Sequence, residues 1–168
     1  NKSFSLEHIR QEYPVYGTTD YRHPAIEILQ KNGSRISSLF YKGYEIQEGK
    51  PELEGLPASF AKKEEAQTLK IFLEDAVAGL EVCLLYTVWH DRDVITRSVQ
   101  FKNHSDSEII LTKMLSMSLD IRESEFDAMT LYGAHNNERN IDRRPLTSGT
   151  VQIESLRGTS SPHQSPFM

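Results

Sequence analysis

The sequence predicts an all-β protein, built as a sandwich of antiparallel sheets. Apolar residues in most hydrophobic runs recur with a period of two, which is the spacing of a strand with one face buried. Turn residues such as the Asn32-Gly33 pair separate these runs, and helix signals are few. Short alternating runs divided by turns are typical of a β-sandwich.

The first expected element is the one helix. Ser5 is placed to cap a short helix from Leu6 to Tyr13, in which Leu6, Ile9 and Tyr13 share one side. Pro14 follows and would end it, because proline lacks the amide hydrogen that continues a helix.

Three strands are expected next. The runs from Ala25 to Leu29 and from Ile36 to Ile46 flank Asn32-Gly33, which is the strongest short signal for a hairpin turn. We therefore expect these two strands to pair with each other. A further strand is expected from Thr68 to Glu74.

The run from Val82 to Trp89 is apolar on both faces, so it is expected to be a central strand covered on both sides. The run from Val94 to Asn103 alternates more clearly, and the short polar link Asp91-Arg-Asp93 predicts an antiparallel hairpin between the two. A long strand is then expected. Its apolar face, broken only by Lys113, is formed by Leu111, Leu115, Met117 and Leu119.

Length and charge limit the classes of function. The 168 residues contain no internal linker, so a single domain over residues 1–168 is expected. A net charge of −5 argues against a nucleic-acid partner, which needs a concentrated basic surface. No window approaches the apolar run of about 18 residues needed to cross a membrane. The one cysteine, Cys83, cannot form an internal disulfide, which favours a reducing, cytoplasmic location.

Several kinds of catalytic site do not fit the sequence. The six histidines lack the spacing of a metal site, so no metal or other cofactor is expected. There is no Gly-x-Ser-x-Gly motif for a nucleophilic serine and no glycine-rich phosphate loop. His90 and Asp91 would point to opposite faces of a strand, so we expect a solvated hairpin end there. The remaining acidic cluster is expected to be a solvated loop, made of Asp120, Glu123, Glu125 and Asp127.

Two segments are unusually rich in Arg, Asn, Glu and His: Gly133–Leu146 and Glu154–Phe167. Arg143 and Arg144 should point to opposite faces of a strand. One of the two is expected to be buried against a carboxylate such as Asp142 or Glu154. We expect these arginines and Arg157 to stabilise a domain interface, because guanidinium groups bind carboxylates through two parallel hydrogen bonds.

These two segments also carry a resemblance to a known family, together with three others. The other segments are Glu12–Ala25, Lys50–Ala58 and Val94–Asn103. In order and spacing all five resemble the N-terminal domain of bacterial family 36 α-galactosidases. The resemblance implies an antiparallel β-supersandwich of the galactose-mutarotase type that precedes a catalytic (β/α)₈ barrel. It also implies that residues 1–168 are an incomplete copy of that domain, with strands missing at both ends.

The same resemblance implies a function. Enzymes of this family remove terminal α-linked galactose from raffinose-type oligosaccharides and melibiose. They retain the anomeric configuration, use two barrel aspartates and need no metal. The partners implied here are the C-terminal barrel of the same protein, a galactoside substrate and other copies in a homotetramer. We expect no catalytic residue in this chain, because the motif that carries the nucleophile is absent from it.

One residue is predicted to contact substrate. In the family that the chain resembles, the turn matching Gly133-Ala-His135 commonly carries an aromatic residue, often tryptophan, that lines the pocket of the neighbouring barrel. Here the position is His135. An imidazole can stack weakly and donate a hydrogen bond to a hydroxyl, but it offers a smaller apolar surface than an indole.

Two alternative functions remain open from the sequence. The first is a free-standing carbohydrate-binding or structural sandwich, which would display exposed aromatic residues on one flat face. The second is a sugar epimerase of the mutarotase type, which needs a histidine and a glutamate converging on one sheet face. His135 and Glu138 are the candidate pair, although both are expected within one turn.

Overall fold

The structure is a computed structural model that describes residues 9–17, 20–55, 58–122, 125–154, 156 and 164–167. The chain forms two compact units, Asn1–Asp120 and Ile121–Met168. Each unit is described by itself below, and a single domain over residues 1–168 stays a prediction. Every regular element within the described ranges is a strand, and every ladder between strands is antiparallel. The predicted all-β class is confirmed.

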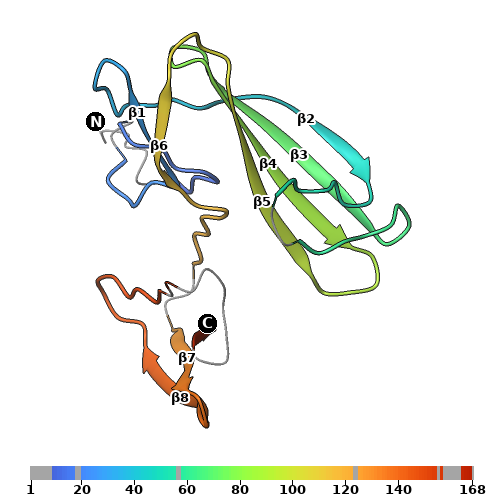
Figure 1. Ribbon diagram of the computed structural model, residues 1–168, viewed down its shortest axis with the longest axis vertical. Helices are drawn as coiled ribbons and strands as arrows, with labels where there is room; N and C mark the ends of the chain where they lie inside the picture. The colour runs from blue at the N-terminus through green and yellow to red at the C-terminus, as the bar shows by residue number, and fades with distance from the viewer. Residues whose placement is uncertain are drawn as a thin grey trace. The chain divides into compact units, whose positions relative to one another are not determined.

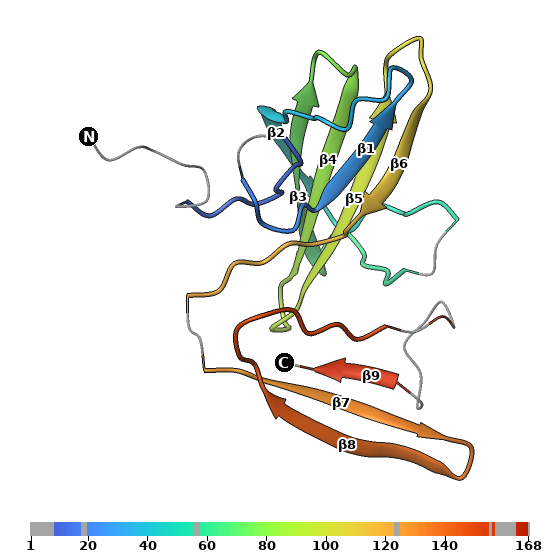
Figure 2. The ribbon, with the colours of Figure 1, turned by 90° about the vertical axis from the view of Figure 1, so that its left-hand side faces the viewer.

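The first unit contains two sheets, visible as separate layers in Figure 1. The larger sheet has the order β2-β3-β4-β5. Its strands are β2 (Phe40–Glu48), β3 (Ala66–Asp75), β4 (Leu80–Trp89) and β5 (Ile95–Asn103). The smaller sheet pairs β1 (Ile26–Gln30) with β6 (Ile109–Met114). Figure 2 shows β1 and β6 in front of β4 and β5.

The core of this unit lies between the two sheets, which makes the fold sandwich-like. Ile26 and Ile28 of β1 are fully buried, and so are Val82 and Leu84 of β4. Side chains from β3, β5 and β6 pack around them: Ile71, Leu73, Val99, Phe101 and Ile109. Burial of such side chains stabilises a fold by roughly 1.5–3 kcal/mol each.

The prediction of a central strand followed by a hairpin is confirmed. β4 lies between β3 and β5, and its register with β5 runs from Leu80↔Asn103 to Val88↔Ile95. Cys83 and Leu85, on the face opposite the core, are also buried. Burial raises the pKa of the Cys83 thiol, so this cysteine is free but shielded from solvent.

The predicted hairpin between the first two strands is wrong. The turn at Asn32-Gly33 does form, since the Gly33 amide donates to the Gln30 carbonyl at 2.8 Å and Gly33 has φ +83°. However, β1 pairs with β6 and not with β2. After the turn, Ser37 N donates to the Tyr16 carbonyl and Ser38 N to an Asp75 carboxylate oxygen. These bonds direct residues 34–39 toward the larger sheet, so β2 begins only at Phe40.

The predicted long strand from Leu111 to Leu119 is also wrong, because β6 ends at Met114. Its partner β1 begins at Ile26, which pairs with Met114. Beyond that point there is no neighbouring strand to continue the ladder in the part of the chain that the structure describes. The Leu115 amide makes one more bond, to the Ala25 carbonyl at 2.8 Å, and the following residues leave the sheet.

The predicted N-terminal helix is contradicted where the structure describes it. Residues 9–13 are not helical, while Leu6 and the two residues after it lie outside the described residues. Tyr13 is 6% exposed and its hydroxyl donates to the Leu115 carbonyl at 2.7 Å. Val15 forms an isolated bridge with Ile26. Contacts with β1 and with the end of β6 therefore hold this segment in a non-helical conformation.

The second unit contains a three-stranded sheet in the order β8-β7-β9. Its strands are β7 (Asp127–Ala134), β8 (Asn137–Pro145) and β9 (Gln164–Phe167). β7 and β8 form a hairpin, and β9 pairs with the other edge of β7. The polar segment from Gly133 to Leu146 is thus the end of β7, the turn and β8.

No helix in the described part of the chain is long and apolar enough to cross a membrane.

Candidate functional site

The turn of the β7–β8 hairpin carries His135, the one residue predicted to contact substrate. β7 ends at Ala134 and β8 begins at Asn137, so His135 and Asn136 form a two-residue turn. His135 is exposed, and no hydrogen bond or ion pair ties its ring to any residue that the structure describes. Its imidazole is available to a ligand.

The backbone of this turn has an unusual shape. Asn136 has φ 63° and Arg139 has φ 60°, a left-handed region that asparagine tolerates and that is uncommon for arginine. The register shifts between Tyr132 and Ala134, which makes a β-bulge. A Cβ added at Gly133 would lie 2.1 Å from the Asn137 carbonyl oxygen. Glycine is therefore required where the two strands approach most closely.

Local hydrogen bonds hold the turn. The Asn136 amide donates to the Glu138 carboxylate at 2.9 Å, and the Asn140 side chain donates to the Asn137 carbonyl at 2.9 Å. His135 lies in the turn and Glu138 is the second residue of β8, whose carboxylate stabilises the backbone of the turn. They do not face each other across a sheet, which is the arrangement that a mutarotase needs.

The two adjacent arginines of β8 each pair with an aspartate. Arg143 binds Asp127 through Nε at 2.7 Å and NH2 at 2.5 Å. The NH2 of Arg144 lies 3.3 Å from Asp142. Their side chains are 70% and 54% exposed, so the expectation that one of them is buried is wrong. In this three-stranded sheet, the arginine and the aspartate of each ion pair are both open to solvent. Arg157 lies outside the described residues.

A charged cluster in the first unit joins the buried Arg97 to Tyr86 and to Glu12, whose side chain is 60% exposed. The Arg97 guanidinium stacks on the Tyr86 ring, 4.0 Å from its centroid, and the Tyr86 hydroxyl donates to the Glu12 carboxylate. Burial raises the pKa of Tyr86, and the bond to Glu12 raises it further. Burial also raises the pKa of the neighbouring Tyr13 to about 12. The Arg97 side chain is only 7% exposed, so an external ligand cannot reach it.

No group of three or more His, Cys, Asp or Glu side chains that could hold a metal ion is found within the ranges described. His90 is exposed in the turn between β4 and β5, as predicted for a solvated hairpin end. The second unit exposes side chains that can donate hydrogen bonds or stack, such as His135 and Tyr132.

Comparison with known proteins assigns the family. The sequence profile described as "Glycosyl hydrolase family 36 N-terminal domain" matches residues 1–168. The chain belongs to this domain family. The resemblance predicted from the sequence is confirmed, and the fold follows that of the family.

The relatives are named α-galactosidases. Alpha-galactosidase AgaA from Geobacillus stearothermophilus is 47% identical over all of this chain, and alpha-galactosidase Mel36A from Lactobacillus acidophilus is 44% identical. The crystal structure of AgaA matches with a TM-score of 0.90 over 96% of this chain. The chain spans only 23% of the length of each of these proteins. Solved forms of AgaA include complexes with raffinose and stachyose.

Proposed function

We propose that this chain is the non-catalytic N-terminal domain of an α-galactosidase. The whole enzyme would remove terminal α-D-galactosyl residues from raffinose-type oligosaccharides and melibiose. The observation that carries the proposal is the match of the entire chain to proteins of that name at 43–47% identity. The raffinose and stachyose complexes of AgaA support the class of substrate.

The test is activity of the full-length protein and of this chain separately. The full-length protein should release galactose from raffinose and nitrophenol from a nitrophenyl α-galactoside. The 168-residue chain should release neither, because it lacks the motif that carries the nucleophile in the family that it resembles. Saturable nitrophenol release by the purified chain would refute the division of roles, and an inactive full-length protein would refute the assigned activity.

Within this enzyme, the domain would help to shape the substrate pocket through the β7–β8 turn. His135 is exposed, and Gly133, Asn136 and Glu138 hold the turn around it. Such a turn can present an imidazole to a sugar hydroxyl without moving. Loss of the His135 imidazole would remove one neutral hydrogen bond or a partial stacking contact, worth about 1 kcal/mol.

His135→Ala in the full-length enzyme should therefore raise KM a few-fold and leave kcat nearly unchanged, which is the pattern of lost uniform binding. His135→Trp should bind substrate at least as well as the wild type. His90→Ala is the matched control, because His90 is an exposed histidine in the turn of a different hairpin. Unchanged kinetics together with a lower Tm in His135→Ala would make His135 a structural residue.

The proposed enzyme is a cytoplasmic homotetramer in which this domain supports assembly. The edge strand β2 favours association, because Tyr41, Tyr44 and Ile46 are 60–65% exposed on it. Unpaired edge strands with apolar side chains tend to associate. A free cysteine, Cys83, is consistent with a reducing compartment.

A further inference from the structure

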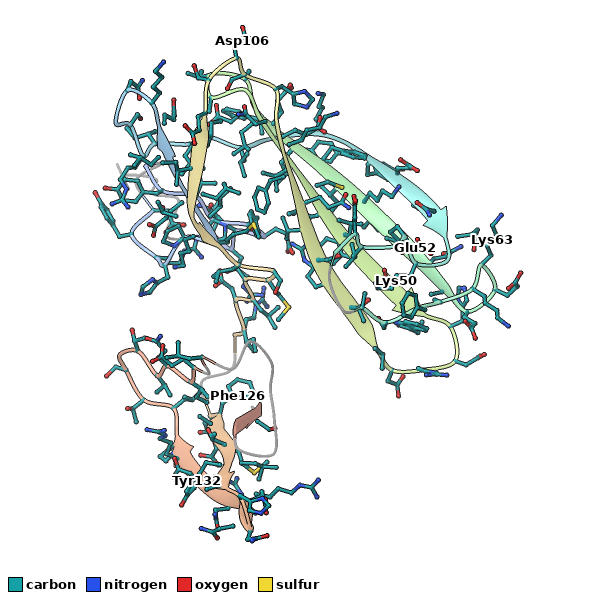
Figure 3. All side chains as sticks on the ribbon, viewed as in Figure 1. Lys50, Glu52, Lys63, Asp106, Phe126 and Tyr132 are labelled. Carbon is teal, nitrogen blue, oxygen red and sulfur yellow. The ribbon has the colours of Figure 1, made fainter. Side chains whose placement is uncertain are left out.

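The second unit has a pocket on one face of its sheet. The pocket measures about 410 Å³, within the range of about 300–1,000 Å³ that is usual for small-molecule sites. It is lined by Thr130, Tyr132, Asp142, Arg144, Gln152 and Ile153. Figure 3 marks Tyr132, which β7 carries next to the β7–β8 turn.

The register of the hairpin explains why these residues meet. Thr130 of β7 lies opposite Asp142 of β8. On the same face, Tyr132 lies two positions from this pair toward the turn, and Arg144 lies two positions from it in the other direction. Thr130 is 8% exposed, whereas Tyr132 is 49% exposed. The lining of the pocket thus includes a buried hydroxyl and an accessible aromatic ring.

Three polar side chains of the pocket, those of Asp142, Arg144 and Gln152, are paired with each other or with a neighbour. Arg144 lies 3.3 Å from Asp142, and the Gln152 amide donates to the Glu154 carboxylate at 3.1 Å. Because its charges are balanced, the pocket has no excess positive charge to attract an anion. A donor and an acceptor side by side suit neighbouring hydroxyl groups, and an aromatic ring suits the apolar face of a sugar ring.

We propose that this pocket binds one pyranose unit of an oligosaccharide. Tyr132 stacks against the sugar ring, and Asp142 and Arg144 bind its hydroxyls. The proposal rests on the proposed function, because the sugar is taken to be part of an α-galactoside such as raffinose or stachyose. The lining of the pocket does not include His135.

The test is sugar binding by the full-length enzyme with its catalytic site blocked. The blocking ligand is saturating 1-deoxygalactonojirimycin, which is present in a solved complex of AgaA, and complete loss of raffinose hydrolysis checks that the site is blocked. Isothermal titration calorimetry with raffinose and with stachyose should then still detect saturable binding. Tyr132→Ala should weaken this binding at least five-fold, and Tyr132→Phe should retain it, because the stacking ring is kept.

Two further variants keep the result interpretable if Tyr132→Ala folds poorly. Asp142→Asn changes a hydrogen-bonding group with little change of volume and should weaken binding several-fold. Tyr21→Ala is the matched control, because Tyr21 is an exposed tyrosine of the first unit that lies outside its strands. It should bind the sugars as the wild type does.

The proposal is overturned if the blocked enzyme binds neither sugar, or if Tyr132→Ala and Asp142→Asn both bind as tightly as the wild type. Binding does not require turnover. Sugar binding to the blocked enzyme tests the pocket, whereas hydrolysis of raffinose tests the proposed activity. A negative result for one is therefore distinguishable from a negative result for the other.

Discussion

Replacement of Arg22 by alanine should destabilise the first unit strongly. Its guanidinium binds Asp20 through Nε and NH2 at 2.9 Å and Asp120 through NH1 at 2.5 Å. NH2 also donates to the Ile9 carbonyl at 2.9 Å. Arg22 thus connects the segment before β1 with the segment after β6. The Asp20 side chain is only 1% exposed, so Arg22→Ala leaves a buried carboxylate without its cation.

The expected loss of stability in Arg22→Ala follows from how deeply each partner of the ion-pair network is buried. Removing one member of a fully buried ion pair costs about 3–5 kcal/mol. Arg22 is 29% exposed and Asp120 is 34% exposed, so solvent screens part of the network and exposed pairs contribute at most about 1 kcal/mol. The Arg22 backbone amide, which donates to Asp20 at 3.1 Å, is kept in the variant. We expect a loss of roughly 2–4 kcal/mol, or about 5–15 °C in Tm for a chain of this size.

Urea unfolding followed by the fluorescence of Trp89 measures this loss. Trp89 is the one tryptophan of the chain and lies in the same unit as Arg22. Arg35→Ala is the control, because Arg35 is 55% exposed and its guanidinium lies as far as 4.0 Å from the Glu27 carboxylate. The control should change the free energy of unfolding by less than about 0.5 kcal/mol. Equal effects of Arg22→Ala and Arg35→Ala would refute the reasoning.

The pH dependence provides a second check. The hydrogen bond from the Arg22 side chain holds the pKa of Asp20 below its ordinary value. In the unfolded chain that pKa is about 3.9. The pair therefore stabilises the fold fully above this pH, and its contribution is lost as the pH falls through the lower, folded pKa. The difference in the free energy of unfolding between wild type and Arg22→Ala should be widest at about pH 6 and should become smaller below about pH 4.

Two further perturbations test the larger sheet. Asp75 is 3% exposed and accepts from the amides of Ser38, Val77 and Ala78 at 2.8–3.0 Å. Asp75→Ala leaves these donors without an acceptor and should cost roughly 2–3 kcal/mol in urea unfolding, with Asp75→Asn losing less because one oxygen remains. The chain alone should associate through β2, and Ile46→Lys should shift its sedimentation toward monomer. A monodisperse wild-type monomer at high concentration would contradict the second prediction.

The elements that the sequence predicted correctly depend on local patterns. β4 has apolar residues on both faces, and a short polar link leads to β5, so the pairing needs no information from elsewhere. The turn at Asn32-Gly33 is equally local and also forms. The pairing of the strand before it is not local. β1 reaches β6, about eighty residues later in the chain, because Ile26 and Ile28 are buried between the sheets. Local turn chemistry does not encode that choice.

The candidate site was predicted only in part, because the sequence shows local patterns and not which residues meet across strands. The density of polar residues around His135 marks the β7–β8 hairpin as unusual, and the family resemblance placed His135 in a turn. Sequence reasoning missed Tyr132. Its position on the face that also carries Asp142 and Arg144 depends on the register of β7 against β8, and a bulge at Gly133 shifts that register. A run of alternating polar residues therefore predicts two faces without showing which residues of the neighbouring strand share each face.

His135 and Tyr132 occupy one hairpin, but their surroundings make them independent. The shape of the turn depends on Gly133 and on the Glu138 carboxylate, so replacing the His135 side chain should leave the register and the Tyr132 pocket intact. Tyr132 lies in the strand before the bulge, and its ring can be removed without altering the turn. A variant of each residue should then affect a different measurement: KM at the catalytic site for His135, and sugar binding to the blocked enzyme for Tyr132. If both variants changed both measurements equally, the hairpin would act as one structural unit, and neither side chain could be assigned its own contact.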